Sequence, residues 1–453
     1  MTYIKEEKQG AKSVYYKITT DKAGKELSRR KVEMPLFRID RDDGVWFLLY
    51  DDDMNILTEP TRYLNFMMSM KSITTRKNSA NALRLLYIFL SLHNCNVRDI
   101  TLEKLNELIK FLQGINLNPV SHQVETYRCN ESVNNYLGVY REFFRQSQIP
   151  CEALFDAKVS VQSFTFENDS AGATEKTQYL NNLRTSSNAR SIPKYISPDE
   201  FEALNKKAIE KQDKLAQCIM RLMYCYGMRL GEVLGLTIED IKEASRDNTL
   251  VPLIIIRNRV SDKEFQYAKN LGHIQNKEAY KSKQYTKSRA EIIIDYSLYE
   301  LILDYINEVH IPILEDNPDK YAKGNADIVS LRDIPEFNHY VFLNRQGNVL
   351  SGQTWGNYLK QYFLECNIQI DTNVKEFNLS HRFRHGFAML HAHYRSHPVN
   401  ALELQTMMRH KAMSSTMVYY NPTAEEEFKI KEEFIQELFE LIPSLEEGSE
   451  LFK

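Results

Sequence analysis

The chain of 453 residues is too long for one ordinary hydrophobic core, which predicts two or three domains. Its 43% hydrophobic and 26% charged residues are typical of a soluble globular protein. No apolar run approaches the roughly 20 residues that a membrane-spanning helix needs, and the N-terminal MTYIKEEKQG lacks the apolar core of a secretory signal. Six cysteines without a CxxC pair are typical of reduced thiols. We therefore expect a cytoplasmic protein that does not contact a membrane.

The charge is unevenly distributed along the chain. The net charge is −3, but residues 424–453 hold ten Glu and three Lys, so residues 1–423 carry +4. Residues 257–291 hold nine Lys and Arg against four Asp and Glu. Local basic faces, more than the overall sum, attract phosphate groups. On composition alone, ordinary solvated surface remains the better explanation.

Residues 1–58 contain short runs that alternate or cluster β-forming residues, SVYYKITT, VEMPLFRI and VWFLLY. This pattern predicts a small strand-rich N-terminal extension. The acidic residues between 40 and 53 argue against an anionic partner for that part of the extension.

Residues 59–155 are predicted to be all-α. Four stretches have helical character: RYLNFMMSM, NSANALRLLYIFLSL, LEKLNELIKFLQGI and ESVNNYLGVYREFFRQS. In the second stretch Leu83, Leu86 and Leu90 recur at helical spacing. Arginine and lysine side chains are scattered over these helices, as they would be on the solvated surface of a helical bundle.

Residues 156–197 lose this periodicity and predict a flexible, basic linker. The segment 197–200, Ser-Pro-Asp-Glu, is a helix-start signal and predicts the beginning of the next domain. From 198 to 423 helices alternate with the strand-like runs VPLIIIRN, AEIIID and YVFLN. We expect a mainly α, α+β domain with a small β-sheet, followed by an acidic C-terminal helix or tail at 424–453.

Two pairs of residues in this domain are spaced for chemistry on phosphate. Arg229 and Glu232 are three apart, so on a helix they share a face. A guanidinium is a fixed fork of donors that suits phosphate, and Glu232 would hold that fork in place. His381 and Arg384 repeat the spacing. An isolated pair of this kind is more often a surface ion pair or a polar patch at a helix N-terminus.

Two further segments complete the set. His410 precedes Tyr419 by nine residues, and a tyrosine becomes a covalent nucleophile when its proton is removed and the phosphate is neutralised. The stretch 281–289, KSKQYTKSR, leads into the strand AEIII, and a lysine on such a hairpin can act as a general acid. Either it holds a catalytic lysine or it is a loop that contacts phosphate without one.

A metal site is the competing interpretation of this region. His381 and His385 are four apart, and three more histidines follow by residue 397. No Cys or paired carboxylate completes a ligand set nearby, and two arginines are poor neighbours for a cation. We therefore expect no metal and no cofactor, although a metal-dependent hydrolase remains an alternative.

The order Arg, Lys, HxxR, His, Tyr resembles the tyrosine recombinase or phage integrase family. GMRLGEVLGL is similar to its first arginine box, SHRFRHGFAML to its HxLRHxxA box, and MRHKAMSSTMVYY to its LGHxxxxTTxxY box. The resemblance covers 198–423 well and 60–150 weakly, where the family has a helical core-binding domain. It does not account for 1–58.

The resemblance implies a role for each matching residue. Tyr419 would attack the scissile phosphate and form a 3′-phosphotyrosine. Arg229 and Arg384 would clamp the non-bridging oxygens, His410 would donate to one of them, and His381 would help to accept the tyrosine proton. Neither ATP nor metal would be required, because the ester conserves the bond energy.

Lys283 would protonate the departing 5′-oxygen, with Lys281 and Lys287 as alternatives. Glu232 and His385 would support the site. The chain departs from the family's boxes at Arg409, where the family usually has Gly, and at Phe383, where it usually has Leu. Tyr419 and Tyr420 form a doublet, in which only the spacing from His410 favours Tyr419.

The resemblance also implies double-stranded DNA with an inverted-repeat core site as the partner, with a dimer on each site and a tetramer in the synapse. An accessory directionality protein, a mobile element and a bacterial nucleoid are part of the same expectation, and exchange would pass through a Holliday junction. An apolar stripe on the acidic tail would either cap its own domain or, as the resemblance favours, dock into a neighbouring protomer. The candidate DNA contacts are Arg76, Lys77, Arg84, Arg141, Arg145, Arg184, Arg190, Lys194, Lys281, Lys287 and Arg289.

Two alternatives stay open besides the metal-dependent hydrolase. One is a DNA-binding relative that has lost catalysis. The other is an enzyme like a type IB topoisomerase, with the same chemistry but without synapsis. The helical domain and the tail favour recombination.

Overall fold

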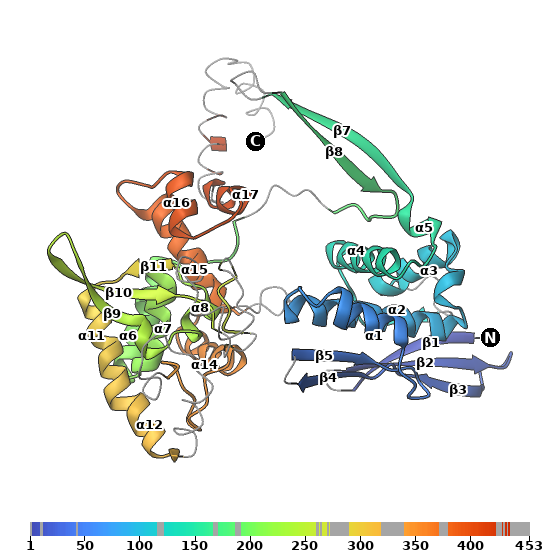
Figure 1. The fold of residues 1–453 in the computed structure, drawn as a ribbon, viewed down its shortest axis with the longest axis horizontal. Helices are drawn as coiled ribbons and strands as arrows, with labels where there is room; N and C mark the ends of the chain where they lie inside the picture. The colour runs from blue at the N-terminus through green and yellow to red at the C-terminus, as the bar shows by residue number, and fades with distance from the viewer. Residues whose placement is uncertain are drawn as a thin grey trace, which may run out of the picture. The chain divides into compact units, whose positions relative to one another are not determined.

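The computed structural model describes most of the chain in two compact units, Met1–Ser187 and Asn188–Lys453 (Figure 1). The described residues are 2–422 and four residues of the tail, Phe428, Lys431, Glu432 and Phe434. The exceptions within 2–422 are 10–11, 42–43, 116–121, 166–170, 186–191, 260–261, 263–264, 270, 272–289, 319–338 and 371–378. In the described part no helix is long and apolar enough to cross a membrane.

The first unit begins with two small antiparallel arrangements of strands. A four-stranded sheet has the order β3-β2-β1-β6, in which the short β6 pairs parallel to β1. A separate hairpin joins β4 and β5. The strands are β1 (Thr2–Gln9), β2 (Lys12–Thr20), β3 (Glu26–Val32), β4 (Leu36–Arg41), β5 (Gly44–Leu49) and β6 (His122–Gln123).

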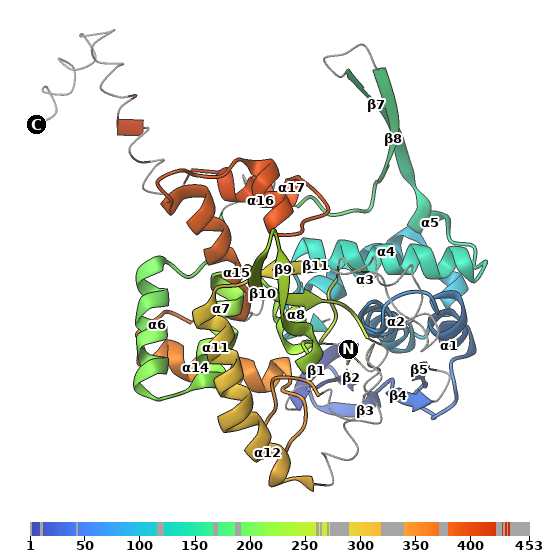
Figure 2. The same cartoon turned by 60° about the vertical axis from the view of Figure 1, so that its left-hand side comes forward.

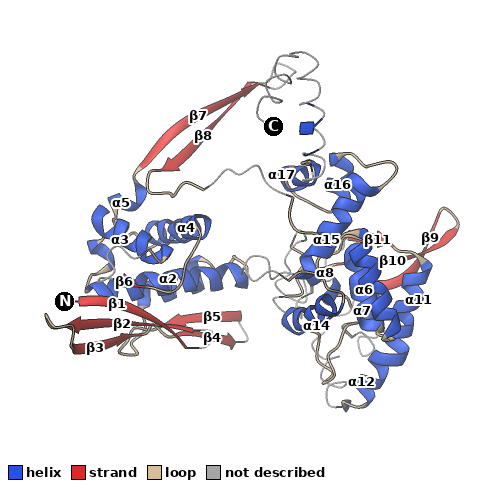
Figure 3. Cartoon of the chain, turned by 180° about the vertical axis from the view of Figure 1, so that it is seen from behind, coloured by secondary structure: helices blue, strands red, loops and turns tan. Residues whose placement is uncertain are grey.

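The helices of the first unit pack against these strands. The long helix α2 contacts α4 and also the strands β2 to β5, as Figure 3 shows. Its N-cap is Ser72, whose side chain accepts from the Thr75 amide, and Asn94 ends it in a left-handed conformation. The elements are α1 (Thr58–Arg62), η1 (Tyr63–Met67), α2 (Ile73–His93), η2 (Val97–Asp99), α3 (Leu102–Gln113), α4 (Asn130–Gln146) and α5 (Glu152–Phe155).

Strands and helices of the first unit share one hydrophobic core. Tyr15 and Phe47 from the strands are buried in the same cluster as Leu86 and Leu137 from α2 and α4. The carboxylate of Glu6 on β1 is buried as well and accepts from the backbone amides of residues 125 and 126. The division that the sequence predicted at residue 58 is therefore corrected: the strands are one layer of the helical unit, because neither layer buries its apolar face alone.

The region predicted as a flexible linker also differs. Strands β7 (Ala157–Thr165) and β8 (Ala171–Tyr179) pair antiparallel along their full length and extend away from the helices of the first unit (Figures 1 and 2). At the base of this β7–β8 hairpin, the guanidinium of Arg141 stacks over the Tyr179 ring, with its Cζ 3.9 Å from the ring centroid. Strand β7, AKVSVQSFT, alternates apolar and polar residues in its first half, a strand signal that the sequence analysis missed. Arg190 lies outside the described residues.

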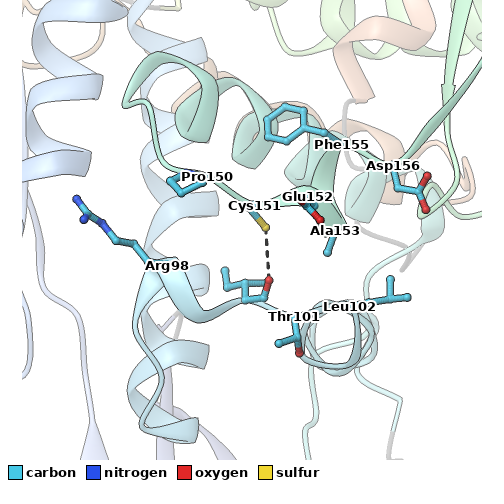
Figure 4. Close-up of a pocket in the computed structure, with 10 residues that line it drawn as sticks. Arg98, Thr101, Leu102, Pro150, Cys151, Glu152, Ala153, Phe155 and Asp156 are labelled. Atoms are coloured by element: carbon cyan, nitrogen blue, oxygen red, sulfur yellow. Dashed lines mark hydrogen bonds between the residues drawn. The ribbon is translucent and has the colours of Figure 1, made fainter.

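A pocket of about 840 Å³ lies in the first unit, where the N-terminal ends of α3 and α5 meet (Figure 4). Thr101 and Cys151, which precede the two helices, both line it, and the Cys151 thiol donates to the Ile100 carbonyl at 3.6 Å. None of the candidate catalytic residues lines this pocket.

The second unit is mainly helical around a three-stranded antiparallel sheet of order β11-β10-β9. The helix start predicted at residues 197–200 is confirmed, because Ser197 and Glu200 form a reciprocal capping box at α6. Helix α7 lies at the centre of the core and contacts α6, α11 and α15. The run YVFLN forms isolated bridges and no strand of its own.

The elements of this unit, in chain order, are α6 (Pro198–Glu210), α7 (Lys214–Tyr224), α8 (Leu230–Leu234), η3 (Ile238–Asp240), β9 (Ile241–Arg246), β10 (Thr249–Ile256), β11 (Ala290–Ile293), α11 (Tyr296–Tyr305), η4 (Ile306–His310), α12 (Ile311–Glu315), α14 (Gly352–Glu365), α15 (Leu379–Met389), η7 (Leu390–Tyr394), α16 (Ala401–Met407), α17 (Ser414–Met417) and η8 (Val418–Tyr420).

Candidate active site

The first arginine of the site is positioned by a tight turn between α7 and α8. Gly227 has a φ of +58°, and a Cβ there would lie 2.6 Å from Cδ1 of Phe387 on α15, so the turn requires glycine. Arg229 follows as the N-cap residue of α8. Its backbone amide donates to Oε2 of Glu232 at 2.9 Å, and its Nη1 donates to Oε1 at 2.8 Å. The predicted pairing of these two residues is present.

The second arginine, Arg384 on α15, is only 1% exposed. Its guanidinium donates to the carbonyl oxygens of Gly227 and Met408. Burial, followed by repulsion from Arg229, lowers the pKa of Arg384 to about 9, which keeps the group charged at neutral pH. One buried guanidinium therefore connects the turn before Arg229 to the turn before His410.

His410 lies in the turn between α16 and α17. Its backbone amide donates to the Gln405 carbonyl at 3.0 Å, and its Nδ1 lies 3.0 Å from the Thr416 hydroxyl. Arg409, the residue before it, places Nη2 2.7 Å from Oε2 of Glu232. The Glu232 carboxylate thus receives two arginines, and its side chain is 2% exposed.

The predicted nucleophile, Tyr419, lies in η8, directly after α17, and is 3% exposed. Its hydroxyl lies 2.6 Å from Nδ1 of His385, and its backbone carbonyl accepts from Nε2 of His393 at 2.6 Å. The neighbouring Tyr420 has a different environment, because its hydroxyl donates to the Val399 carbonyl at 2.6 Å. Of the doublet, it is Tyr419 whose hydroxyl contacts an imidazole of the site.

Burial sets the protonation of the site. It raises the pKa of Tyr419 to about 12, although Arg384 and Arg229 oppose the rise. Burial and the nearby cations lower the pKa of His381 and of His410 to about 4. Burial and the neighbouring His381 lower the pKa of His385 to about 3. At neutral pH the three imidazoles are neutral and the phenol keeps its proton.

The histidine beside the nucleophile differs from the one expected. His381 was expected to help accept the tyrosine proton, whereas the structure gives the hydroxyl contact to His385. The two rings are adjacent, with centroids 4.6 Å apart. The sequence predicted His385 only as a supporting residue, because spacing alone does not tell which of two residues one helical turn apart faces a third segment.

The arginines expected to contact DNA on the first unit are partly structural. Arg76 is buried, and its guanidinium donates to the Leu64 carbonyl and to Asn65. Arg141 is also buried and donates to the Leu154 carbonyl. This corrects the expectation for these two residues, because their donors are used inside the fold. Arg84 is half-buried and donates to the Met34 carbonyl at 2.7 Å.

Other expected contacts are exposed or lie beyond the description. Lys77, Arg145, Arg184 and Lys194 are exposed, and Arg145 pairs with Glu142 at 2.8 Å. The three lysine candidates for the general acid and the neighbouring arginine lie outside the described residues, namely Lys281, Lys283, Lys287 and Arg289.

Three residues of the site were missed by the sequence analysis. Arg409 was noticed only as a departure from glycine, and His393 only as part of a histidine cluster. Lys269 follows β10 and, being exposed, contributes a positive charge that helps to lower the pKa of His381. The spacing of Arg229 with Glu232, and of His381 with Arg384, did not point to any of these three residues.

No group of three or more His, Cys, Asp or Glu side chains is arranged to hold a metal ion in the part of the chain that the structure describes. Within the histidine run, His385 and His393 contact Tyr419, and Nδ1 of His391 accepts from Arg395 at 3.1 Å.

Comparison with known proteins gives one family match. The model of the phage integrase family matches residues 194–426, a little over half of the chain. No curated protein sequence matches.

Solved structures of recombinases are similar to this chain at low identity. A XerH site-specific recombinase bound to difH substrate is 15% identical, with a TM-score of 0.47, and the match covers 79% of this chain and 80% of that one. A Tn1549 transposon integrase in complex with transposon right end DNA is 16% identical, with a TM-score of 0.47 and coverage of 84% and 100%. A lambda integrase dimer bound to a COC′ core site is 12% identical, with a TM-score of 0.46 and coverage of 80% and 76%.

We predict that Glu232→Gln destabilises the second unit by about 3–5 kcal/mol at neutral pH, because it leaves buried guanidinium groups without a carboxylate. Burial raises the pKa of Glu232, but Arg409, Arg384 and Arg229 together hold it below its ordinary value. A depressed pKa contributes stability above the unfolded value of about 4.3, and this is lost as the pH falls through the folded value. The difference in the free energy of unfolding between variant and wild type should therefore shrink as the pH falls below about 4.3. Urea unfolding at several pH values measures it.

The matched control is Glu291→Gln, which removes the exposed partner of Arg246. An exposed pair contributes at most about 1 kcal/mol, so this variant should unfold like the wild type. Equal effects of the two substitutions would contradict the importance of the buried carboxylate.

Proposed function

Because the chain belongs to the phage integrase family, whose members are site-specific recombinases acting on DNA, we propose that it cleaves and rejoins DNA through a 3′-phosphotyrosine on Tyr419. One observation carries this proposal. The Tyr419 hydroxyl lies 2.6 Å from a neutral imidazole of His385, beside a cluster in which Arg229 and Arg384 are both charged. This is the pairing of nucleophile and base that covalent catalysis requires, with donors for a phosphate next to it.

The proposed cleavage step uses Tyr419 and His385 together with Lys283, which is assigned from the sequence. Oη of Tyr419 attacks the phosphorus, the bond from phosphorus to the 5′-oxygen breaks, and the phosphotyrosine forms on the 3′ side. His385 accepts the phenol proton at Nδ1, in the tautomer that carries its hydrogen on Nε2. The departing 5′-oxygen takes a proton from Lys283. Atoms and charge balance without a cofactor.

The charge that builds on the non-bridging oxygens is stabilised by Arg229, Arg384 and His410. Both arginines are held before substrate arrives, Arg384 by two carbonyl oxygens and Arg229 by Glu232. Fixed donors of this kind need no reorganisation as charge develops, which is the main source of rate in such sites. His381, adjacent to His385, would donate to the same phosphate.

Rejoining is the reverse step with a different strand. The 5′-hydroxyl of a partner strand attacks the phosphotyrosine and releases Tyr419, so the bond energy is conserved. Recombination between two inverted-repeat core sites would use a dimer on each site and a tetramer in the synapse, with a Holliday junction between the two strand exchanges. We propose a mobile genetic element in a bacterial cell as the setting, with an accessory protein to set direction.

The DNA contacts proposed on the described residues are the exposed Lys77, Arg145, Arg184 and Lys194. Arg190, Lys281, Lys287 and Arg289 remain proposals from the sequence. Such contacts to phosphate fix the register of a protein on DNA and make its affinity depend on salt, but carry no base readout.

We predict that wild-type protein forms a covalent complex with a nicked suicide duplex from the ends of the element that encodes it, in the presence of EDTA. Tyr419→Phe should form none, because the attacking oxygen is missing, while its gel shift on the same DNA should persist. A denaturing gel measures the covalent band.

Tyr420→Phe is the matched control, since the Tyr420 hydroxyl donates to the Val399 carbonyl. It should form the covalent complex normally. If the covalent band persists in Tyr419→Phe and disappears in Tyr420→Phe, Tyr420 is the nucleophile. DNA binding by wild type without any covalent band would favour an inactive relative, and plasmid relaxation without recombination would favour a topoisomerase-like activity.

We predict that His385→Ala slows covalent-complex formation by about 10²–10⁴-fold at neutral pH, the usual contribution of a general base. The wild-type rate should vary little from about pH 6 to about pH 9, because the pKa of His385 lies near 3. The variant's rate should rise about tenfold per pH unit, because hydroxide then removes the proton from a phenol of pKa about 12. Single-turnover cleavage across this range measures both profiles.

The matched substitution is His391→Ala, further along the same helical segment, where the imidazole contacts Arg395 and not the tyrosine. It should keep the wild-type profile. If His381→Ala acquires the steep pH dependence and His385→Ala does not, His381 is the acceptor.

We predict that Lys283→Ala cleaves ordinary DNA about 10²–10⁴-fold more slowly, but cleaves a 5′-bridging phosphorothiolate at nearly the wild-type rate. A thiolate leaves without a proton, because the pKa of a thiol is only about 8.5. The same comparison with Lys281→Ala, Lys287→Ala and Lys269→Ala identifies the acid. Rescue by the sulfur substrate in one of these variants, and not in Lys283→Ala, would assign the role to that residue.

A further inference from the structure

Arg409 has a backbone conformation that its side chain does not favour. Its φ is +54°, in the left-handed region that glycine adopts freely and other L-residues rarely adopt. The turn that it forms, residues 407–410, ends at His410 and connects α16 to the segment that carries Tyr419. Glycine would fit this turn without strain, so the contacts of the arginine side chain must offset the strain.

Those contacts lead to the first arginine box. Nη2 of Arg409 donates to Oε2 of Glu232 at 2.7 Å and approaches the Gly227 carbonyl at 3.4 Å. Nη1 donates to the Met407 carbonyl at 3.2 Å, within its own turn. The side chain is 19% exposed, so the ion pair with Glu232 is largely withdrawn from solvent.

The backbone of the same turn receives the two other arginines. The carbonyl of Arg409 accepts from Nη2 of Arg229 at 3.5 Å, and the carbonyl of Met408 accepts from Arg384. Each oxygen of the Glu232 carboxylate is occupied, Oε1 by Arg229 and Oε2 by both the Arg229 amide and Arg409. Arg409 therefore closes a ring of contacts that runs from α8 through Glu232 to the turn before His410.

We propose that Arg409 is a positioning residue that fastens the turn carrying His410 to the Arg229–Glu232 pair, so that the donors from these two segments meet the scissile phosphate as one rigid unit. This inference rests on the proposed function, since it concerns the same phosphate. It assigns to Arg409 no contact with the reacting atoms. The gain is geometric: a misplacement of about 1 Å in such a site costs about 10²-fold in rate.

The test compares Arg409→Gly and Arg409→Lys with wild-type protein. Glycine relieves the strained φ and removes the guanidinium, and lysine keeps a positive charge within reach of Glu232 without the planar fork. The rate of covalent-complex formation is measured on the suicide duplex. DNA affinity is measured by gel shift in a Tyr419→Phe background, so that no cleavage intervenes.

We expect Arg409→Gly to cleave about 10–100-fold more slowly with a dissociation constant for DNA within about twofold of wild type. Arg409→Lys should recover part of the lost rate. A residue needed only for folding would not separate rate from affinity in this way, nor would it be rescued by a charge.

Gln212→Gly is the matched control for relief of backbone strain. Gln212 has a φ of +53°, is exposed and follows α6, so glycine removes the same kind of strain without touching the site. It should leave the cleavage rate unchanged while raising the thermal midpoint of unfolding.

The possible outcomes separate this inference from the proposed function. If wild type forms no covalent complex, the proposed function fails and this inference fails with it. A covalent complex that Arg409→Gly forms as fast as wild type overturns only the inference. Equal losses of rate and affinity in Arg409→Gly, or no recovery in Arg409→Lys, would also overturn it, because the effect would then not come from holding Glu232.

Discussion

The site depends on one buried carboxylate. A site that stabilises the transition state of a reacting phosphate must hold positive charges close together before any substrate arrives. Like charges in a buried site repel one another strongly. Arg229, Arg384 and Arg409 converge in this way around Glu232, whose side chain is 2% exposed. An isolated carboxylate would be neutral there because of its burial, but the guanidinium groups keep it ionised. The carboxylate in turn makes the cluster of arginines tolerable, so each sign of charge is stable only with the other.

This arrangement also determines how the surrounding chain is held. Glu232 accepts from the backbone amide at the start of α8, and Arg384 donates to carbonyl oxygens in two turns that are far apart in sequence. α15 thus connects the arginine turn after α7 with the turn before His410, and the residue after Arg384, His385, contacts the Tyr419 hydroxyl. Backbone groups that loops would otherwise leave to water are used as ligands for guanidinium groups. The hydrogen bonds that position the arginines of the site are therefore the same ones that hold these loops in place.

The sequence singled out the residues that the structure brings together, but not the contacts that hold them. Three-residue spacing drew attention to Arg229 and Arg384, and the nine-residue spacing from His410 drew attention to Tyr419. Strand β9 was missed by the sequence analysis, although the pair Asp247–Asn248 is a signal for a tight hairpin turn. Both residues have positive φ in the turn that joins β9 to β10. The burial of Arg76 was unpredictable for a different reason: its guanidinium donates to the Leu64 carbonyl and the Asn65 side chain in η1, 12 and 11 residues earlier, and no local pattern predicts that pairing. The partners of buried polar side chains were therefore harder to predict from the sequence than the secondary structure.

The protonation of the free site bears on the order of events in catalysis. The pKa of Tyr419 lies near 12 and that of His385 near 3, so the proton stays on the phenol although the two groups are in contact. In the proposed mechanism, a free phenolate would therefore not be the attacking species. The basicity of the phenol oxygen falls only as it bonds to phosphorus, while the phosphate charge offsets the cations that depress the imidazole pKa values. In the proposed mechanism, proton transfer would then accompany attack, and Tyr419 would become reactive only when a phosphate occupies the arginine cluster.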